Sequence, residues 1–252
     1  ITVAGITNQR ETVVVWDKNS GKPIHNALVW QDRRTEEICE KLRLDGLSET
    51  ITKKTGLIID PYFSGTKIKW ILENVPEAKN KLDSGNLIIG TIDTWLIWNL
   101  SKGSSHSTDV TNASRTMLYN IEEDAWDKDL LKILNIDSSL LPNVKNSYDD
   151  FGIIDKSFFG SSILIGGVAG DQQSASIGQL CFKEGMIKST YGTGCFVLMN
   201  TGSKKMVSQS NLLATTAYKL DTNKSFALEG SIFNAGTVVQ WMRDELNFIS
   251  NA

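Results

Sequence analysis

Residues 163–180, ILIGGVAGDQQSASIGQL, indicate most clearly how this chain folds. The first seven of these residues are apolar or glycine and predict a buried strand, whereas residues 174–180 are small or apolar and predict a helix. Asp171 therefore lies between the end of a strand and the start of a helix. Open α/β proteins usually bind their ligands at such a position.

The composition is that of an ordinary soluble globular protein. The chain has 252 residues, enough for one large domain or two smaller ones, with 40% hydrophobic and 22% charged residues. A net charge of −3 gives no electrostatic reason to expect nucleic acid or an anionic membrane as a partner. The apolar stretches are far shorter than the roughly 20 residues that span a bilayer, so we expect no membrane insertion.

Cysteine and histidine usage excludes several kinds of site. Cys39, Cys181 and Cys195 form an odd set without CxxC spacing, which favours reduced thiols and a cytoplasmic location. His25 and His106 are the only histidines, too few for a Ser-His-Asp triad or a histidine-rich zinc site. The sequence contains neither GxGxxG nor GxxxxGK[ST], so dinucleotide-binding and Walker-type sites lose support.

Strand and helix patterns alternate along the chain and predict α/β architecture. We expect a buried strand at residues 1–6 and further strands at 12–16, 24–30 and 87–90. The strands at 12–16 and 24–30 should form a hairpin. Helices are expected at 35–42, 65–74, 93–100 and 127–134. After residue 180 the pattern becomes rich in strands, at 186–190, 196–200, 212–220 and 225–229, followed by a helix at 235–248 with Val238, Val239, Met242 and Leu246 facing inward. A second domain should start near residues 181–188.

The chemistry-bearing residues each have a plain structural alternative. By position alone, Asp171 is more often a helix N-cap than a catalytic base. The YGTG turn at 191–194 could approach a phosphate closely, through glycines with positive φ, or could be a simple hairpin turn. Adjacent Arg10 and Glu11 could bind a polyhydroxylated ligand or form a surface ion pair. For Trp30 and Tyr62 the choice lies between core and pocket wall.

Six longer motifs occur together in a specific order. They read GITNQRET (5–12), YFSGTKIKWILEN (62–74), GTIDTWLIW (90–98), TDVTNASRT (108–116), AGDQQ (169–173) and TYGTGCF (190–196). Taken together they resemble the FGGY carbohydrate kinases over essentially the whole chain, and most of all the members that act on glycerol. The resemblance implies a ribonuclease-H-like (actin-like ATPase) fold. Residues 1–182 would form the substrate-binding N-terminal domain and residues 183–252 the beginning of the nucleotide-binding C-terminal domain.

The resemblance also implies roles for individual residues. Asp171 would be the general base toward a primary hydroxyl of glycerol and would lie near Mg²⁺ through water. The polar side of the glycerol site would comprise Arg10, Glu11, Tyr62 and Gln172, and its apolar wall Trp30 and Phe196. Thr193, Gly236 and Gln240 would face ATP. Positioning and charge neutralisation would do most of the catalytic work.

The sequence departs from the family pattern at both ends. It starts inside an apolar run without Met, so the phosphate loop expected before Ile1 is missing, as is most of the second domain. We therefore expect a piece of a longer protein that alone binds ATP poorly and turns over little, and a full-length protein that forms homo-oligomers. Two alternatives stay open: a kinase for a pentulose or other polyol, and a non-catalytic binding protein or fragment on the same fold.

Overall fold

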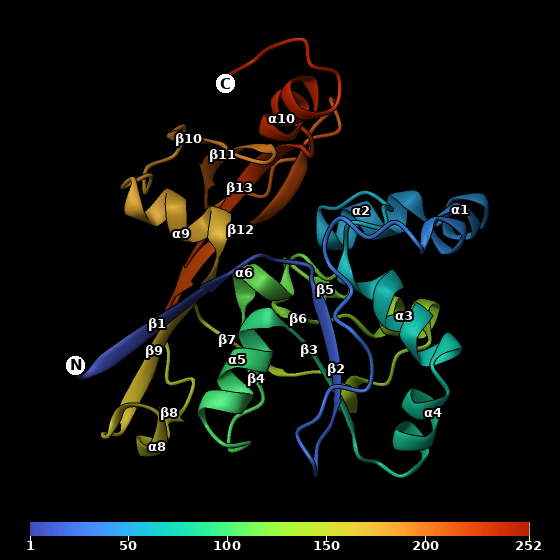
Figure 1. Ribbon diagram of the computed structural model, residues 1–252, viewed down its shortest axis with the longest axis vertical. Helices are drawn as coiled ribbons and strands as arrows, with labels where there is room; N and C mark the ends of the chain where they lie inside the picture. The colour runs from blue at the N-terminus through green and yellow to red at the C-terminus, as the bar shows by residue number, and fades with distance from the viewer. Residues whose placement is uncertain (252) are drawn as a thin grey trace.

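The computed structural model describes residues 1–251 and divides into two regions (Figure 1). The first region contains β1 Val3–Asn8, β2 Val13–Asp17, α1 Glu36–Leu44, α2 Ser48–Thr55, α3 Ser64–Asn74, α4 Pro76–Asp83, β3 Leu87–Thr91, α5 Ile92–Leu100, β4 Ser107–Asp109, α6 Val110–Ala113, β5 Tyr119–Asn120, β6 Ala125–Trp126, α7 Lys128–Leu134, the 3-10 helix η1 Ser138–Leu140, β7 Asn143–Lys145, β8 Ile153–Ile154, α8 Lys156–Phe159, β9 Ile163–Gly170 and α9 Asp171–Gly178. The second region contains β10 Ile187–Tyr191, β11 Cys195–Gly202, β12 Leu213–Leu220, β13 Asn223–Ile232 and α10 Gly236–Asp244.

Parallel pairing of β1 with β9 determines where the polar residues of the chain meet. The register places Asn8 opposite Gly170, so both strands reach their carboxyl ends together. The residues that follow β1 and the residues that open α9 must therefore lie side by side. The predicted strand at 163–169, followed by a helix, is confirmed, although the helix begins at Asp171, three residues earlier than expected.

Two predicted strands differ from the structure. Side chains of β1 are exposed or half-buried up to Asn8, not buried, because β1 lies at the edge of the sheet ordered β1-β9-β8 and pairs only with β9 among residues 1–251. The segment 24–30 forms no strand and makes only isolated bridges, Val13 with Leu28 and Trp16 with Pro23. The antiparallel partner of β2 is β3, which comes later in the chain.

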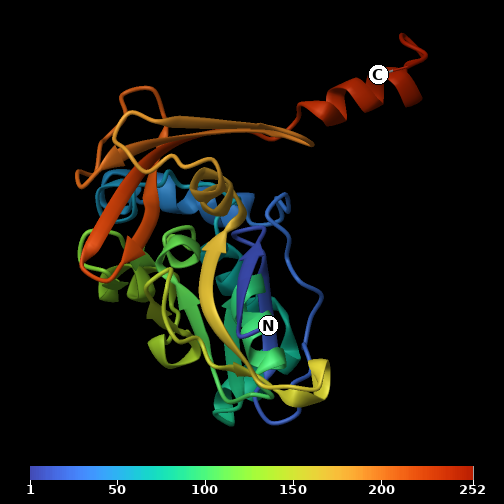
Figure 2. The same ribbon diagram turned by 90° about the vertical axis from the view of Figure 1, so that its left-hand side faces the viewer.

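Most predicted helices are present, and their differences have local causes. The helices predicted at 35–42, 65–74, 93–100 and 127–134 correspond to α1, α3, α5 and α7. Helix α4 was not predicted: it begins at Pro76, two residues after α3 ends, because proline fits the first turn of a helix. Helix α10 ends at Asp244, and Val238 and Val239 are 42% and 40% exposed instead of inward, because α10 projects from the body (Figure 2).

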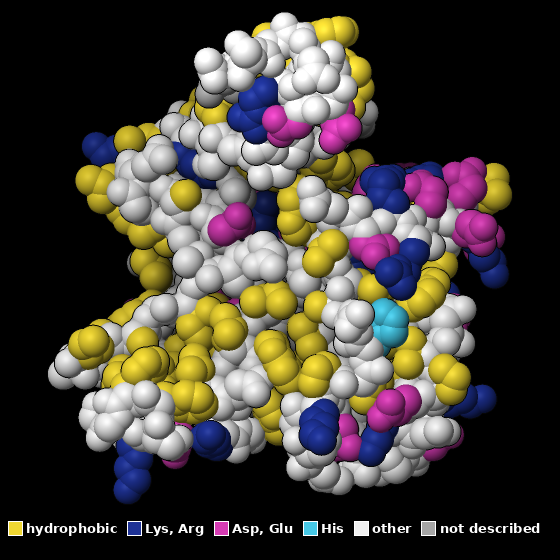
Figure 3. All heavy atoms as spheres, viewed as in Figure 1, with side chains coloured by type: hydrophobic (Ala, Val, Ile, Leu, Met, Phe, Trp, Pro, Cys, Tyr) yellow, Lys and Arg dark blue, Asp and Glu magenta, His cyan; other side chains and the backbone are white. Residues whose placement is uncertain are grey.

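The largest hydrophobic cluster lies around β2, β3, α3 and α7, with members such as Val13, Phe63, Ile71, Ile89 and Leu134. The second region is built on an antiparallel sheet ordered β10-β11-β13-β12. No helix of the described chain combines the length and apolar character that crossing a bilayer requires. Hydrophobic side chains also gather on the surface over β1, β8, β9 and α5 (Figure 3), where Val3, Ile153 and Phe159 are exposed.

A buried polar cluster joins β1 to α5 and α6. Asp93 is fully buried and accepts hydrogen bonds from Thr91 Oγ1 (2.5 Å), Thr108 Oγ1 (2.6 Å) and Asn8 Nδ2 (3.5 Å). Asn8 Nδ2 also donates to Asn112 Oδ1 at 2.9 Å. Burial raises the pKa of Asp93 to about 6, an effect that the two hydroxyl donors oppose but do not cancel.

Replacing Asp93 by Asn should change the pH dependence of stability. Because the pKa of Asp93 rises from 3.8 to about 6 on folding, wild-type stability should fall as pH rises from about 4 to about 6. The loss should be on the order of 3 kcal/mol, from about 2 pKa units at 1.36 kcal/mol each. Urea unfolding of full-length wild type and Asp93→Asn from pH 4 to 7 measures it. If the difference in the free energy of unfolding between wild type and variant does not change with pH, the prediction is contradicted.

Candidate active site

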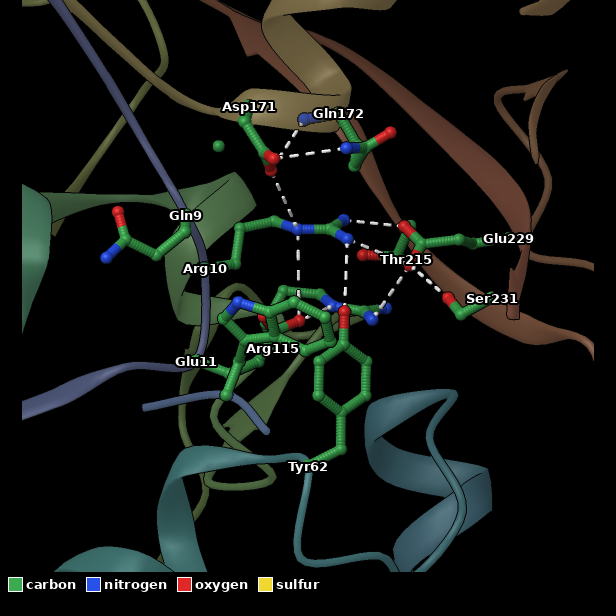
Figure 4. Close-up of polar contacts among 12 residues, drawn as sticks. Gln9, Arg10, Glu11, Tyr62, Arg115, Asp171, Gln172, Thr215, Glu229 and Ser231 are labelled. Carbon is green, nitrogen blue, oxygen red and sulfur yellow. Dashed lines mark hydrogen bonds and ion pairs between the residues drawn. The ribbon is translucent and has the colours of Figure 1, made fainter. Parts of the chain in front are cut away.

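The candidate site lies at the carboxyl ends of β1 and β9 (Figure 4). Arg10 and Glu11 follow β1, and Asp171 opens α9. Arg10 Nε lies 3.5 Å from Asp171 Oδ1 and 3.8 Å from Glu11 Oε1. The parallel register thus brings together three residues that the sequence singled out, and Arg10 and Glu11 are buried instead of forming a surface ion pair.

A strained turn directs Arg10 and Glu11 into the same buried space. Glu11 has a φ of 63°, and the Thr12 N–H donates to the Arg10 carbonyl at 2.8 Å across it. A three-residue turn with positive φ at a residue other than glycine is rare and costs about 1–3 kcal/mol. Ser64 Oγ donates to the Glu11 carbonyl at 3.1 Å and helps to hold the turn.

Two arginines and two glutamates form a charge-balanced network beneath Asp171 (Figure 4). Arg10 Nη1 and Nη2 bind Glu229 Oε2 and Oε1 at 2.5 and 2.9 Å. Arg115 binds Glu11 Oε1 at 2.7 Å and Glu229 Oε1 at 3.0 Å. Burial alone would raise the pKa of Glu229, but the two guanidiniums outweigh burial and lower this pKa to about 2. Glu229 is therefore ionised at neutral pH, whereas burial raises the pKa of Glu11 despite the neighbouring Arg10 and Arg115 guanidiniums.

Asp171 is the exposed member of the site. Its side chain is 45% exposed and accepts hydrogen bonds from the Gln172 backbone N–H (2.8 Å) and from Gln172 Nε2 (3.0 Å). Gly170, not Asp171, occupies the N-cap position of α9, and no side chain caps this helix. The N-cap interpretation of Asp171 is therefore wrong, and the carboxylate faces outward beside Arg10.

A buried lysine controls the orientation of Gln172. Lys188 on β10 is 1% exposed and donates to Gln172 Oε1 and, at 2.7 Å, to Thr190 Oγ1; burial lowers its pKa. An ammonium group can only donate, so it holds the Gln172 oxygen and leaves the amide nitrogen facing Asp171. Lys188 thus acts on Asp171 through Gln172.

Aromatic rings form a wall beside the charged network. The Trp30 ring lies edge-to-face against Tyr62, Phe196 and Phe233, with centroids 5.9, 6.0 and 5.6 Å away. The Tyr62 hydroxyl accepts from Arg10 Nη2 at 3.5 Å, so the wall adjoins the guanidinium. Trp30 and Phe196 are only partly buried, and the space-filling view shows the surface hollowed between the α10 end and the body below it (Figure 3).

The residues predicted to face a nucleotide form a second group. The Gly236 and Ala235 N–H groups donate to the carbonyls of Gly192 and Thr193, both at 2.9 Å. A Cβ atom on Gly236 would lie 2.6 Å from the Gly192 oxygen, so this contact requires glycine. Gly192 itself does not adopt the positive φ that the sequence suggested, and neither does the second glycine of the turn. Thr193 is exposed. Gln240, which lies on α10 one turn after Gly236, is exposed as well.

The sequence analysis assigned no side-chain role to four residues of the site. They are Arg115, Lys188, Glu229 and Phe233. Arg115 stands within one of the six motifs, but a buried guanidinium has no periodic pattern that could reveal its partners. A charge inside an apolar strand, as in ALEGSI around Glu229, was the available signal.

The side chains around Asp171 determine whether a magnesium ion fits the site. Residues 1–251 contain no group of three or more His, Cys, Asp or Glu side chains that could hold a metal. Mg²⁺ usually takes one or two carboxylates together with water and substrate phosphates. Asp171, half-exposed, therefore fits a magnesium site only as one carboxylate among waters and nucleotide phosphates.

Family models match both regions of the chain. The N-terminal domain model of the FGGY family of carbohydrate kinases matches residues 1–178, and the C-terminal domain model matches residues 187–252. The chain therefore belongs to the FGGY family of carbohydrate kinases, whose members are phosphotransferases with the actin-like ATPase fold.

Individual relatives show which members of the family this chain resembles. A glycerol kinase of Allorhizobium ampelinum is 59% identical over all 252 residues, which make up 51% of that protein. The crystal structure of Plasmodium falciparum glycerol kinase with ADP has a TM-score of 0.92 at 46% identity, over 100% of this chain and 50% of that one. Xylulose kinase from Rhodospirillum rubrum has a TM-score of 0.83 at 15% identity over 99% and 50%, which shows the fold alone. The chain spans about half the length of the curated relatives it matches.

Lys188→Met should slow phosphoryl transfer by the full-length protein at least about tenfold in kcat. The variant keeps the length of the side chain but lets the Gln172 amide turn away from Asp171. Steady-state kinetics with Lys183→Met, an exposed lysine nearby, as control measures the effect. A kcat for Lys188→Met within twofold of wild type contradicts this role.

Proposed function

We propose that the full-length protein transfers the γ-phosphoryl group of ATP to a primary hydroxyl of glycerol and forms sn-glycerol 3-phosphate. The observation that carries the proposal is the half-exposed Asp171 carboxylate, 3.5 Å from Arg10 Nε and beside a wall of aromatic rings. The relatives named glycerol kinase support the choice of substrate. Because the chain covers about half of them, the activity is a proposal for the whole protein.

The site offers a short polyol both polar and apolar contacts. Arg10 Nε has no hydrogen-bond partner among the described residues and would donate to one hydroxyl, while Glu11 would accept from another. Tyr62 and Gln172 would complete the polar side, and Trp30 and Phe196 would pack against the carbon chain. Two large rings leave little space beyond three carbons, which favours glycerol over a pentulose.

Asp171 would act as general base in the transfer step. Its carboxylate would take the proton of the attacking hydroxyl while that oxygen forms a bond to the γ-phosphorus and the bond to the ADP oxygen breaks. Hydrogen bonds from Gln172 would hold the carboxylate in position. Mg²⁺, when bound with ATP, supplies charge neutralisation, and Asp171 would contact it through water.

Thr193, Gly236 and Gln240 would face the nucleotide. The close contact between Gly236 and Gly192 supports this assignment, because it leaves backbone groups without side chains beside them. We also propose a domain boundary at residues 182–183 and a cytoplasmic location, the latter supported by three free cysteines. Assembly into homo-oligomers stays a prediction from the family resemblance.

Asp171→Asn should abolish catalysis but not binding. A general base contributes about 10²–10⁴-fold, so kcat of the full-length variant should fall by about that factor. Glycerol binding by calorimetry should stay within a few-fold, since the amide keeps the size of the side chain. Asp155→Asn, a carboxylate that caps α8 away from the site, is the control. Unchanged turnover in Asp171→Asn removes this residue from the base role.

A substrate panel tests the choice of acceptor. The full-length protein should phosphorylate glycerol with a higher kcat/KM than xylulose or ribulose, because Trp30 and Phe196, packed edge-to-face, would limit the length of the carbon chain. An ATP-coupled assay at matched acceptor concentrations measures the ranking. Faster turnover of either pentulose would overturn glycerol as the substrate and retain the family.

A further inference from the structure

Glu229 reaches the proposed glycerol site from the opposite region of the molecule. It lies on β13, whereas Arg10 follows β1 and Arg115 follows α6, at sequence separations of 219 and 114 residues. The Glu229 side chain is fully buried and binds both guanidiniums. It is thus a direct polar connection between the strand sheet of the second region and the residues around Asp171.

The connection determines how the buried Arg10 guanidinium is oriented. Glu229 occupies Nη1 and Nη2, and Gln173 Oε1 also accepts from Nη1 at 3.2 Å. Nε remains without a hydrogen bond in the described structure, between Asp171 and Glu11. The stem of Arg10 is fixed as well, because a Cβ on Gly170 would lie 2.5 Å from its Cδ.

Glu229 is itself held firmly. Its strand is flanked by β11 and β12, with Leu198 and Leu213 as its register partners. Ser231 Oγ donates to Glu229 Oε1 at 2.9 Å. Three residues after Glu229, β13 ends at Ile232, and the segment that follows packs against the Gly192–Thr193 turn. A shift of this sheet would therefore move Arg10 as well.

We propose that Glu229 is a positioning residue for glycerol binding: by accepting from both terminal nitrogens it holds the Arg10 guanidinium, with its unpartnered Nε, between Asp171 and Glu11. The inference rests on the proposed function. Buried ion pairs often have no role beyond satisfying each other, and breaking one destabilises a protein whatever its function. A purely structural pair would affect stability but not the KM for glycerol of the folded enzyme, so kinetics separates the two roles.

The first measurement is glycerol phosphorylation by the full-length wild-type protein. If the wild type does not phosphorylate glycerol, the proposed function is refuted together with this inference. Glu229→Gln keeps the shape of the side chain but removes its charge, so Arg10 loses its bidentate partner. The KM for glycerol should rise about tenfold or more, with kcat and the KM for ATP within about threefold. A glycerol KM within twofold of wild type in a folded variant overturns the proposal.

A double variant tests the charge balance. Glu229→Gln leaves one unbalanced positive charge, and Arg115→Met leaves one unbalanced negative charge beside Glu11. The double variant restores neutrality around Arg10, so its increase in glycerol KM should be smaller than the product of the two single increases. Multiplicative effects contradict a shared network.

Two further variants keep the test decisive. Asp124→Asn breaks the ion pairs with Lys219 on β12 and Lys224 on β13. These pairs share no partner with Arg10, so the glycerol KM should stay unchanged. If Glu229→Gln fails to fold, Glu229→Asp retains the charge but is one methylene too short to reach both guanidiniums. Its KM for glycerol should also rise, and an unchanged KM overturns the proposal.

Discussion

The buried ion network around Arg10 is the interaction on which the rest of the site depends. Two guanidiniums and two carboxylates cancel one another's charge, which makes their burial tolerable. Because the four groups come from the segment after β1, the segment after α6 and strand β13, the network fixes the second region against the first. Asp171 adds a fifth charge at the exposed side, where a substrate and a metal ion can reach it.

Backbone geometry supplies the network with its partners. The parallel register of β1 and β9 brings Arg10 to Asp171, and the strained turn at Glu11 sends two consecutive side chains to the same side. Strain of this kind persists only where surrounding contacts hold it. Here the Arg115–Glu11 pair and the Ser64 hydroxyl hold the turn, so part of the stability of the network is used to maintain a functional conformation.

Local signals explain what the sequence could predict. The strand–Asp171–helix unit and four helices were confirmed because apolar periodicity and breakers act over short distances. The edge position of β1, the pairing of β2 with β3 and the exposure of Val238 depend on segments remote in sequence, which no local pattern encodes. Arg10, Glu11 and Asp171 lie together, as the family resemblance implied, but Glu229, which pairs with Arg10, lies 219 residues further along the chain than Arg10.

The same limit explains why the buried lysine escaped prediction. A lysine in a strand is usually a solvated residue, and the sequence around Lys188 gives no sign that its ammonium lies beside Gln172. Its burial is acceptable because Gln172 and Thr190 accept from it, and the negative charges of Glu229 and Asp171 oppose the effect of burial on its pKa. Both regions therefore contribute groups that hold the Asp171 side of the site: Gln172 from α9 and Lys188 from β10. The orientation of the proposed base Asp171 thus depends on side chains from both regions of the chain.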